Sequence, residues 1–399
     1  MANRSGRVNT PISTSELERR WAAVRAAMKD RKIDILLMQN NNDYMGGYVK
    51  YFTDIPAAVG YPITVTFPRE DRMSVIEQGP FGSVRQIPPE GDGVYRGVKT
   101  VYGCPSYATV PYSLAYEAEL AEKALEGFAG ATIGFVGLGT LPISMTKRIE
   151  TGQLSTAKFV DASDMVDEIK VIKSEEEISF IRQNAAIQDA AMKLVMESVK
   201  PGMKEIQIAA IAEHYVLDHG GEQGLVLTGS YQPGEPSGHE HRHYQNKIIR
   251  QGDLLTILVE MNGPAGFYTH LSRTCVFGKA TQEMKDEAAF MLSARNVALK
   301  LLRPGTSCKT VWDAYNAYMH EHGRPEEKRL FCHGQGYETV ERPLVRFDET
   351  FKISKNMNIG CHPTYLTKRL YGNITDNYLI TDNGPERLHK YSEQLVELG

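Results

Sequence analysis

The chain has 399 residues, of which 42% are hydrophobic and 24% are charged. This balance is typical of a folded protein and excludes a disordered chain, and the length is enough for two domains. A total of 45 lysines and arginines against 49 aspartates and glutamates gives a net charge of -4. This charge excludes the basic surplus of a nucleic-acid-binding protein. The longest apolar run, Leu254 to Val259 with Thr256 inside it, is far shorter than the ~20 residues of a membrane-spanning helix.

The cysteines and the N-terminal sequence both predict a cytoplasmic protein. The first fifteen residues, MANRSGRVNTPISTS, contain no apolar stretch of the kind found in a secretory signal. The cysteine number is odd, and no two of these residues are closely spaced: Cys104, Cys275, Cys308, Cys332 and Cys361. Reduced thiols are therefore expected.

The first part of the chain alternates between helical and strand patterns. A helix is predicted over residues 16–30, after Ser13 and Thr14, and another over residues 113–128. Strands are predicted at 34–38, 63–67, 73–78 and 131–137, where short β-rich runs are separated by turn residues. This alternation predicts an α/β domain, which we place at residues 1–165.

The pattern changes at Ser174, which begins a capping box with Glu177 and starts a long predicted helix through Met196. Further helices are predicted at 205–219, 282–302 and 308–322, with a loop rich in glycine and histidine at 229–245. Strands are predicted on both sides of a turn at Asn262-Gly263-Pro264 and again towards the C-terminus. We place this second domain at residues 166–399.

Five motifs in the second domain occur in a characteristic order. They are Gly252-Asp253, His270-Leu271-Ser272-Arg273-Thr274, His333-Gly334-Gln335-Gly336, Cys361-His362-Pro363 and Thr375-Asp376-Asn377. Their order and spacing resemble those of the methionine aminopeptidase, prolidase and creatinase superfamily. The resemblance implies an α/β N-terminal domain plus an α+β pita-bread C-terminal catalytic domain. It also implies a homodimer, in which the N-terminal domain of one subunit closes over the site of the other.

The same resemblance identifies the positions of a metal centre. In the peptidases of this superfamily, five side chains, four of them carboxylates, hold two divalent cations. The corresponding positions here are Glu260, His270, His333, His362 and Thr375, and only the third has the residue type of the peptidases. Two cations about 3.5–4 Å apart need compensating negative charge, and this set supplies one carboxylate. A two-metal peptidase site is therefore not expected.

Two alternatives remain for the three histidines. His270, His333 and His362 could hold one divalent metal ion (zinc, iron or manganese), because three neutral imidazoles with an open position are typical of catalytic zinc and some iron sites. They could instead form a metal-free polar site, as creatinase works on this fold without a metal. A purely structural role is the third interpretation.

Other residues are predicted to take part in proton transfer and substrate binding. His241 and His243 lie in the loop where the superfamily places a substrate-contacting histidine, and a histidine pKa suits proton transfer; incidental surface histidines are the alternative. Glu341 is predicted to act as an acid or base or to pair with Arg342. Together with Glu260 and Tyr268, Arg342 is also predicted to bind substrate, and aromatic rings suit a cationic ligand.

Three residue types in the motifs have mainly structural interpretations. Arg273 and Asp376 are expected to be partners beneath the site. Cys332 and Cys361 stand beside His333 and His362, where either a reactive thiol or an ordinary buried cysteine is conceivable.

We therefore expect a diverged pita-bread hydrolase that cleaves a C–N bond in a small polar metabolite. Three alternatives stay open: a lyase that abstracts a proton and eliminates, like the relatives that cleave dimethylsulfoniopropionate; an Xaa-Pro-type peptidase; and a catalytically inactive binding module. The expected partners are a small-molecule substrate and a second subunit, with no nucleic acid and no membrane.

Overall fold

The computed structural model describes residues 11–40, 47–58, 60–235, 238–366 and 371–399. Within these ranges the chain divides into two compact units, Pro11–Lys170 and Val171–Gly399, and each is described by itself. The division follows the end of helix α5 (Ser163–Lys170). The first unit therefore extends beyond residue 165, where the sequence pattern placed the end of the first domain.

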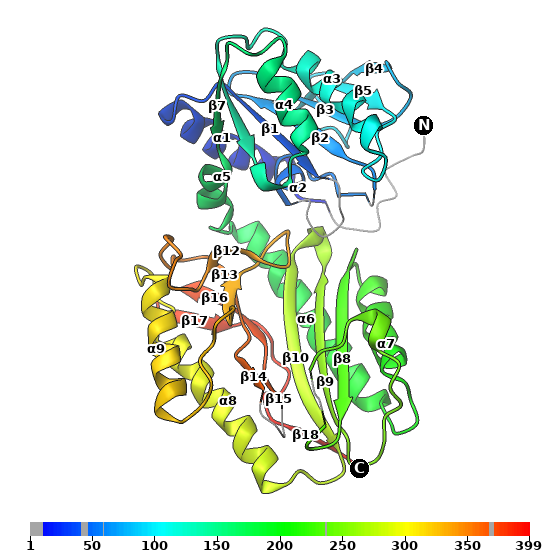
Figure 1. Ribbon diagram of the computed structural model, residues 1–399, viewed down its shortest axis with the longest axis vertical. Coiled ribbons are helices and arrows are strands. Elements are labelled where there is room, and N and C mark those ends of the chain that lie inside the picture. The colour runs from blue at the N-terminus through cyan, green and yellow to red at the C-terminus, as the bar shows by residue number, and fades with distance from the viewer. Residues whose placement is uncertain (1–10, 41–46, 59, 236–237, 367–370) are drawn as a thin grey trace. The chain divides into compact units, whose positions relative to one another are not determined.

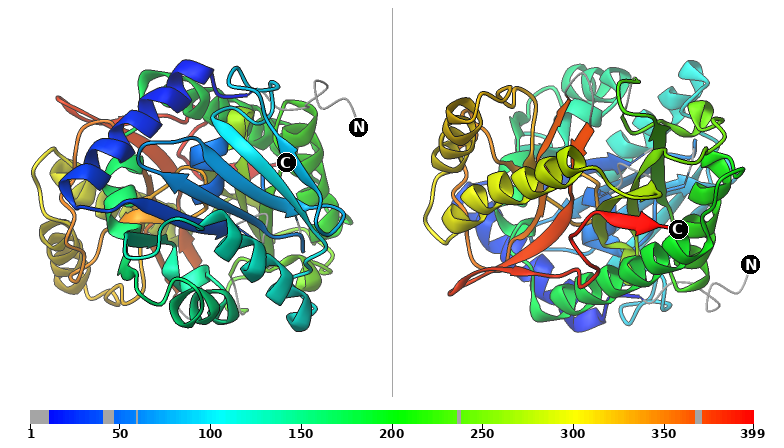
Figure 2. Two further views of the ribbon diagram at one scale, coloured as in Figure 1. Left: turned by 90° about the horizontal axis from the view of Figure 1, so that it is seen from above. Right: turned by 90° about the horizontal axis from the view of Figure 1, so that it is seen from below.

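The first unit is a mixed seven-stranded sheet in the order β4-β5-β3-β2-β1-β6-β7. Helices α3 and α4 cover one face and α1 lies on the other (Figures 1 and 2). Every residue of β1 is buried, because both faces of the sheet are covered. The elements are α1 (Thr14–Asp30), β1 (Ile35–Asn40), α2 (Gly47–Thr53), β2 (Ile63–Pro68), β3 (Met73–Gln78), β4 (Val84–Gln86), β5 (Val98–Cys104), η1 (Pro111–Ser113), α3 (Leu114–Ala124), β6 (Thr132–Val136), η2 (Leu138–Thr140), α4 (Ile143–Thr151), β7 (Lys158–Asp161) and α5.

The second unit contains two main sheets with helices packed outside them (Figure 1). One sheet has the order β18-β10-β9-β8, the other β12-β11-β13-β16-β17, and β14 pairs with β15. The helices are α6 (Glu175–Ser198), α7 (Glu205–Asp218), η3 (Arg242–Tyr244), η4 (Pro264–Gly266), α8 (Gln282–Leu301) and α9 (Cys308–Glu321). The strands are β8 (Gly224–Tyr231), β9 (Leu254–Asn262), β10 (Tyr268–Phe277), β11 (Cys332–Gly334), β12 (Glu341–Leu344), β13 (Asn358–Cys361), β14 (Thr364–Leu366), β15 (Tyr371–Asn373), β16 (Asp376–Thr381), β17 (Gly384–Arg387) and β18 (Val396–Leu398).

Separate hydrophobic cores fix the helices to these sheets. The core of α6 and α7 against the first sheet includes Val195, Ala212 and Val259, all fully buried. A second core joins α8 and α9 to the other sheet through residues such as Ala294, Tyr315 and Ile359. A bridge between Ser272 on β10 and Thr375 connects the two sheets. The inner faces of the sheets are therefore held near each other at this point.

The predicted helix starts are confirmed in atomic detail. Ser13 accepts a hydrogen bond from the Glu16 amide at 3.1 Å and begins α1. Ser174 and Glu177 form the predicted capping box, with N–O distances of 3.2 and 2.7 Å. No helix in the described part of the chain combines the length and the apolar character needed to cross a bilayer.

Candidate active site

The hairpin of β9 and β10 brings Glu260 and His270 together. The two residues are direct cross-strand partners, so their side chains lie on the same face of the sheet. The Nδ1 atom of His270 is 3.4 Å from the Oε1 atom of Glu260. Both side chains are well shielded, with 4% and 13% of their surface exposed. The pair is therefore positioned by the strand register itself.

The second sheet supplies the other two histidines. His333 on β11 pairs with Gly360 on β13, and His362 follows two residues later, so all three positions share one face. A Cβ atom built on Gly360 would be only 2.2 Å from the Nε2 atom of His270. The absence of a side chain at Gly360 therefore makes room for the imidazole that comes from the first sheet.

The structure brings the three predicted histidines into one cluster. The ring centroids of His270 and His333 are 5.2 Å apart, those of His270 and His362 are 5.5 Å apart, and those of His333 and His362 are 5.0 Å apart. Burial, reinforced by the neighbouring imidazoles, lowers the pKa of His333 to about 3 and holds the pKa of His362 well below its usual range. These two rings are therefore neutral at physiological pH.

Three buried amides that the sequence analysis missed tie the cluster together. The side-chain nitrogen of Gln335 donates to Glu260 at 3.1 Å and to the Thr339 carbonyl at 3.0 Å. Asn377 donates to the oxygens of Gln335 and Asn358, both at 2.9 Å. In the sequence, Gln335 and Asn377 could be noticed because they lie inside two of the motifs. Their hydrogen-bond partners could not be predicted, because these partners come from distant segments.

The side chains at the ligand positions do not fit the two-metal centre that the resemblance implies. Glu260 is the one carboxylate among them, and Thr375 offers a hydroxyl that is 3.5 Å from Asn373 Oδ1. Across the described ranges, no group of three or more histidine, cysteine, aspartate and glutamate side chains is arranged to hold a metal ion. Two cations would lack compensating charge here. Binding of one ion by the three histidines stays a prediction.

The structure places His239, and not the predicted pair, next to β10. The Nε2 atom of His239 is 3.4 Å from the Ser272 hydroxyl, and burial lowers the pKa of His239 to about 4. A hydrogen bond from the Glu240 amide to the Thr228 carbonyl fixes this part of the loop to β8. His241 and His243 then lie at and within η3, and both are exposed. His239 is therefore the histidine of this loop whose ring lies beside β10, and proton transfer by His241 or His243 stays a prediction.

The ion pairs that the structure gives Glu341 and Arg342 have other partners, Lys173 and Glu349. Glu341 forms a buried ion pair with Lys173 at 3.2 Å, and its strand partner is Gly334. Arg342 binds Glu349 at 2.5 Å and lies over the ring of Phe351. Adjacent strand residues point to opposite faces, which separates the two side chains. To bind a substrate, the Arg342 side chain would have to leave its ion pair with Glu349.

Tyr268 precedes His270 by two residues on β10 and so points to the same face. Its side chain is fully buried, and its backbone amide donates to the Gly336 carbonyl at 2.6 Å. This bond connects β10 to the His-Gly-x-Gly segment. A contact between Tyr268 and a substrate stays a prediction.

Beneath the site, Asp376 is a fully buried carboxylate surrounded by arginines. It accepts hydrogen bonds from Arg273 at 2.7 Å, Arg295 at 2.9 Å and Arg387 at 3.2 Å. Burial alone would raise the pKa of Asp376, but the neighbouring positive charges lower it. This arrangement supports the structural role expected for Arg273 and Asp376.

The two motif cysteines are also buried. Cys332 and Cys361 are direct cross-strand partners with no exposed surface. Burial raises the pKa of Cys332 well above its usual value, so this thiol is protonated and unreactive at neutral pH. An ordinary buried cysteine is the interpretation that these observations favour.

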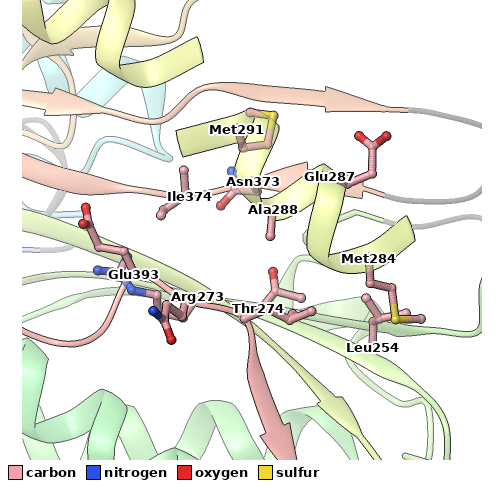
Figure 3. Close-up of a pocket in the computed structure, with 12 residues that line it drawn as sticks. Leu254, Arg273, Thr274, Met284, Glu287, Ala288, Met291, Asn373, Ile374 and Glu393 are labelled. Atoms are coloured by element: carbon pink, nitrogen blue, oxygen red, sulfur yellow. The ribbon is translucent and has the colours of Figure 1, made fainter. Parts of the chain in front are cut away.

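A separate pocket lies further along β10, beside α8 (Figure 3). Its empty volume is about 540 Å³, open solvent included. Figure 3 shows Met284 beside Leu254 at one end and Arg273 beside Glu393 at the other. Its lining residues are Leu254, Arg273, Thr274, Met284, Glu287, Ala288, Met291, Asn373, Ile374, Glu393, Gln394 and Leu395. None of the three clustered histidines belongs to this lining.

Comparison with known proteins identifies the class of this fold and site. Residues 179–382, more than half of the chain, match the model of metallopeptidase family M24. The chain belongs to this family of hydrolases and has the pita-bread fold of its superfamily.

The individual relatives described next have sequence identities of 19–28% to this chain. An Xaa-Pro dipeptidase of Pyrococcus horikoshii is 28% identical over 69% of this chain and 79% of its own length. An uncharacterised hydrolase/peptidase of Sinorhizobium fredii is 25% identical over 96% of both chains. An X-Pro aminopeptidase structure from Thermotoga maritima covers 95% of this chain and 99% of its own, with a TM-score of 0.77 and 19% identity. The prolidase structure from Pyrococcus horikoshii covers 95% of this chain and 100% of its own, with a TM-score of 0.74 and 22% identity.

Proposed function

We propose that this protein hydrolyses a C–N bond in a small polar compound at the cluster of His270, His333 and His362, without the two-metal centre of the M24 peptidases. One observation carries the proposal: imidazoles occupy three of the ligand positions and their rings lie 5.0–5.5 Å apart. Family membership supports hydrolysis. The burial of His270 and His333, each 3% exposed, supports a small substrate.

The pair of Glu260 and His270 has the geometry of a proton-transfer unit. The carboxylate of Glu260 can accept the Nδ1 hydrogen of His270, which leaves the lone pair of Nε2 directed into the cluster. A base placed in this way takes a proton from water as the oxygen attacks the substrate carbon and later returns it to the leaving nitrogen. His239 is the second histidine that can move a proton, and it takes the place that we first gave to His241 and His243.

The metal content is limited to one ion or none in this proposal. The Nδ1 atom of His333 is 2.8 Å from the Gly334 carbonyl, so it carries the hydrogen and leaves Nε2 as the available donor. A bound divalent ion would lower the pKa of a water molecule. Neither the identity of such an ion nor its presence is needed for the proton transfer described above.

An Xaa-Pro-type peptidase is the second candidate. Dipeptidases of this specificity are among the relatives in family M24, and their substrates are themselves small. The ligand positions argue against this candidate, because the carboxylates of a two-metal site are missing. Elimination has no support in these comparisons, and the expected cytoplasmic location and homodimer stay predictions.

Turnover in ¹⁸O-labelled water tests the proposed function. The purified protein is incubated with Xaa-Pro dipeptides and with small amides, amidines and guanidino compounds, and products are analysed by mass spectrometry. We expect ¹⁸O in the product of a non-peptide compound and a loss of about 100-fold or more in His270→Gln, the contribution of a general base. The exposed histidine variant His320→Gln should keep full activity.

Three results would contradict the proposal. Preferred cleavage of Xaa-Pro dipeptides that depends on two equivalents of metal would establish the second candidate. An alkene product without ¹⁸O would establish elimination. Equal activity of His270→Gln and His320→Gln would remove the histidine cluster from the mechanism.

A further inference from the structure

Gln335 connects the two sheets at the point where proton transfer is proposed. It is 1% exposed and contacts both Glu260 and the segment around Thr339. We propose that Gln335 is a positioning residue: in the neutral form of the His270 ring it keeps the hydrogen on Nδ1, so that the lone pair of Nε2 faces the cluster. This inference rests on the proposed function, because it describes how His270 is prepared as a base.

The orientation of the side-chain amides of Asn377 and Gln335 follows from a backbone group that can only donate a hydrogen bond. The Oδ1 atom of Asn377 accepts the backbone N–H of His270 at 2.8 Å, and a backbone N–H can only donate. The amide nitrogen of Asn377 must then donate to the oxygens of Gln335 and Asn358, both at 2.9 Å. The oxygen of Gln335 is therefore an acceptor, and its nitrogen points the other way.

The amide nitrogen of Gln335 has two hydrogens, and both have acceptors. One bonds to the Thr339 carbonyl at 3.0 Å and the other to Glu260 Oε1 at 3.1 Å. The Nδ1 atom of His270 lies 3.5 Å from this nitrogen and 3.4 Å from Glu260 Oε1. No hydrogen of Gln335 is left for Nδ1, and an Nδ1 lone pair would face a carboxylate oxygen. Nδ1 must therefore be the donor, and Glu260 the acceptor.

In the neutral ring, the opposite nitrogen, Nε2, then carries the lone pair. Nε2 of His270 is buried and has no hydrogen-bond partner among the residues that the structure describes. It lies over Gly360 and beside the rings of His333 and His362. A carboxylate that accepts the hydrogen of one ring nitrogen is the usual device that fixes the tautomer at the other. Gln335 acts through this carboxylate, by restricting the direction in which Glu260 can turn.

Nitrogen-15 NMR of the histidine side chains tests this inference without any substrate. The signals of His270 are identified by their disappearance in His270→Gln. In the wild-type protein at neutral pH we expect a protonated Nδ1 and an unprotonated Nε2. In Gln335→Met the carboxylate of Glu260 loses its amide donor, and the Nε2-protonated form should become detectable. If this variant does not fold, Gln335→Leu replaces it.

Gln188→Met is the matched control. Gln188 is a fully buried glutamine whose amide donates to the carbonyls of Met261 and Thr269, the neighbours of Glu260 and His270. Its loss disturbs the same strands without touching the carboxylate, so the His270 signals should keep the wild-type tautomer. A wild-type proton on Nε2, unchanged signals in Gln335→Met, or an equal change in Gln188→Met would each overturn the inference. If only the proposed function is wrong, His270 keeps the expected tautomer, but His270→Gln is as active as the wild-type protein.

Discussion

The imidazole of His270 lies over a residue that has no side chain, Gly360. This contact explains why a glycine occurs in the middle of a buried strand, where it would otherwise weaken the sheet. In the loop before β9, the Glu240 amide donates to the Thr228 carbonyl, and the neighbouring His239 lies 3.4 Å from the Ser272 hydroxyl. Single contacts of this kind determine the composition of the site.

Replacement of Gly360 by alanine tests the close approach. The added Cβ would be 2.2 Å from His270 Nε2, so the ring or the strand must shift. Overpacking of this kind costs about 1–3 kcal/mol in the free energy of unfolding. Urea unfolding measures it, with Gly139→Ala as a control because an added Cβ there meets open space. Equal stability of both variants would contradict the described packing.

A buried carboxyl in the first unit predicts a pH-dependent stability. Burial raises the pKa of Glu117 to about 7, although Thr64 and Ser106 donate hydrogen bonds to it. Because the folded pKa exceeds the unfolded value of 4.5, the folded state binds the proton more tightly. The contribution of protonated Glu117 to the free energy of unfolding is complete below pH 4.5 and is lost as pH rises through 7.

Over this pH interval the free energy of unfolding should fall by about 3 kcal/mol because of Glu117. Urea unfolding of the wild-type protein and of Glu117→Gln, repeated from pH 4 to pH 8, measures it. The wild-type free energy of unfolding should fall more steeply with pH than that of the variant, whose amide does not titrate. Parallel curves would show that Glu117 titrates normally.

At the scale of elements, the hairpin of β9 and β10 and the long helices of the second unit were predictable, because turn residues and polar caps mark many of their ends. The short helices α2 and α4 were not predicted. The strands β11 and β12 have three and four residues and carry no periodic signal. The partners of Gln335 and Lys173 come from distant segments, and no local pattern specifies them. The sequence therefore predicted which three histidines lie together but not what the residues around them contact.

The capping box of α6 provides a test at this scale. Ser174→Ala removes the acceptor for the Glu177 amide and should lower the free energy of unfolding by about 1 kcal/mol. Ser179→Ala changes an exposed serine within the same helix and should be neutral or slightly stabilising, because alanine favours the helix interior. The two variants are compared by urea unfolding. A larger loss in Ser179→Ala would contradict the cap assignment.

At the scale of the whole molecule, the chain belongs to metallopeptidase family M24, and we expect that it does not form the two-metal centre of the peptidases. Each unit has its own buried core. The second unit alone contains the histidine cluster and the amides that hold it. Under the proposed function, the reaction at this cluster does not depend on a pair of cations.

Metal content is the most direct measurement of this claim. The purified protein is loaded with excess manganese or zinc, desalted and analysed by inductively coupled plasma mass spectrometry beside His333→Ala. We predict no more than one tightly bound equivalent per chain, and any bound equivalent should disappear in the variant. Two equivalents per chain, retained after desalting, would contradict the replacement of the two-metal centre by histidines.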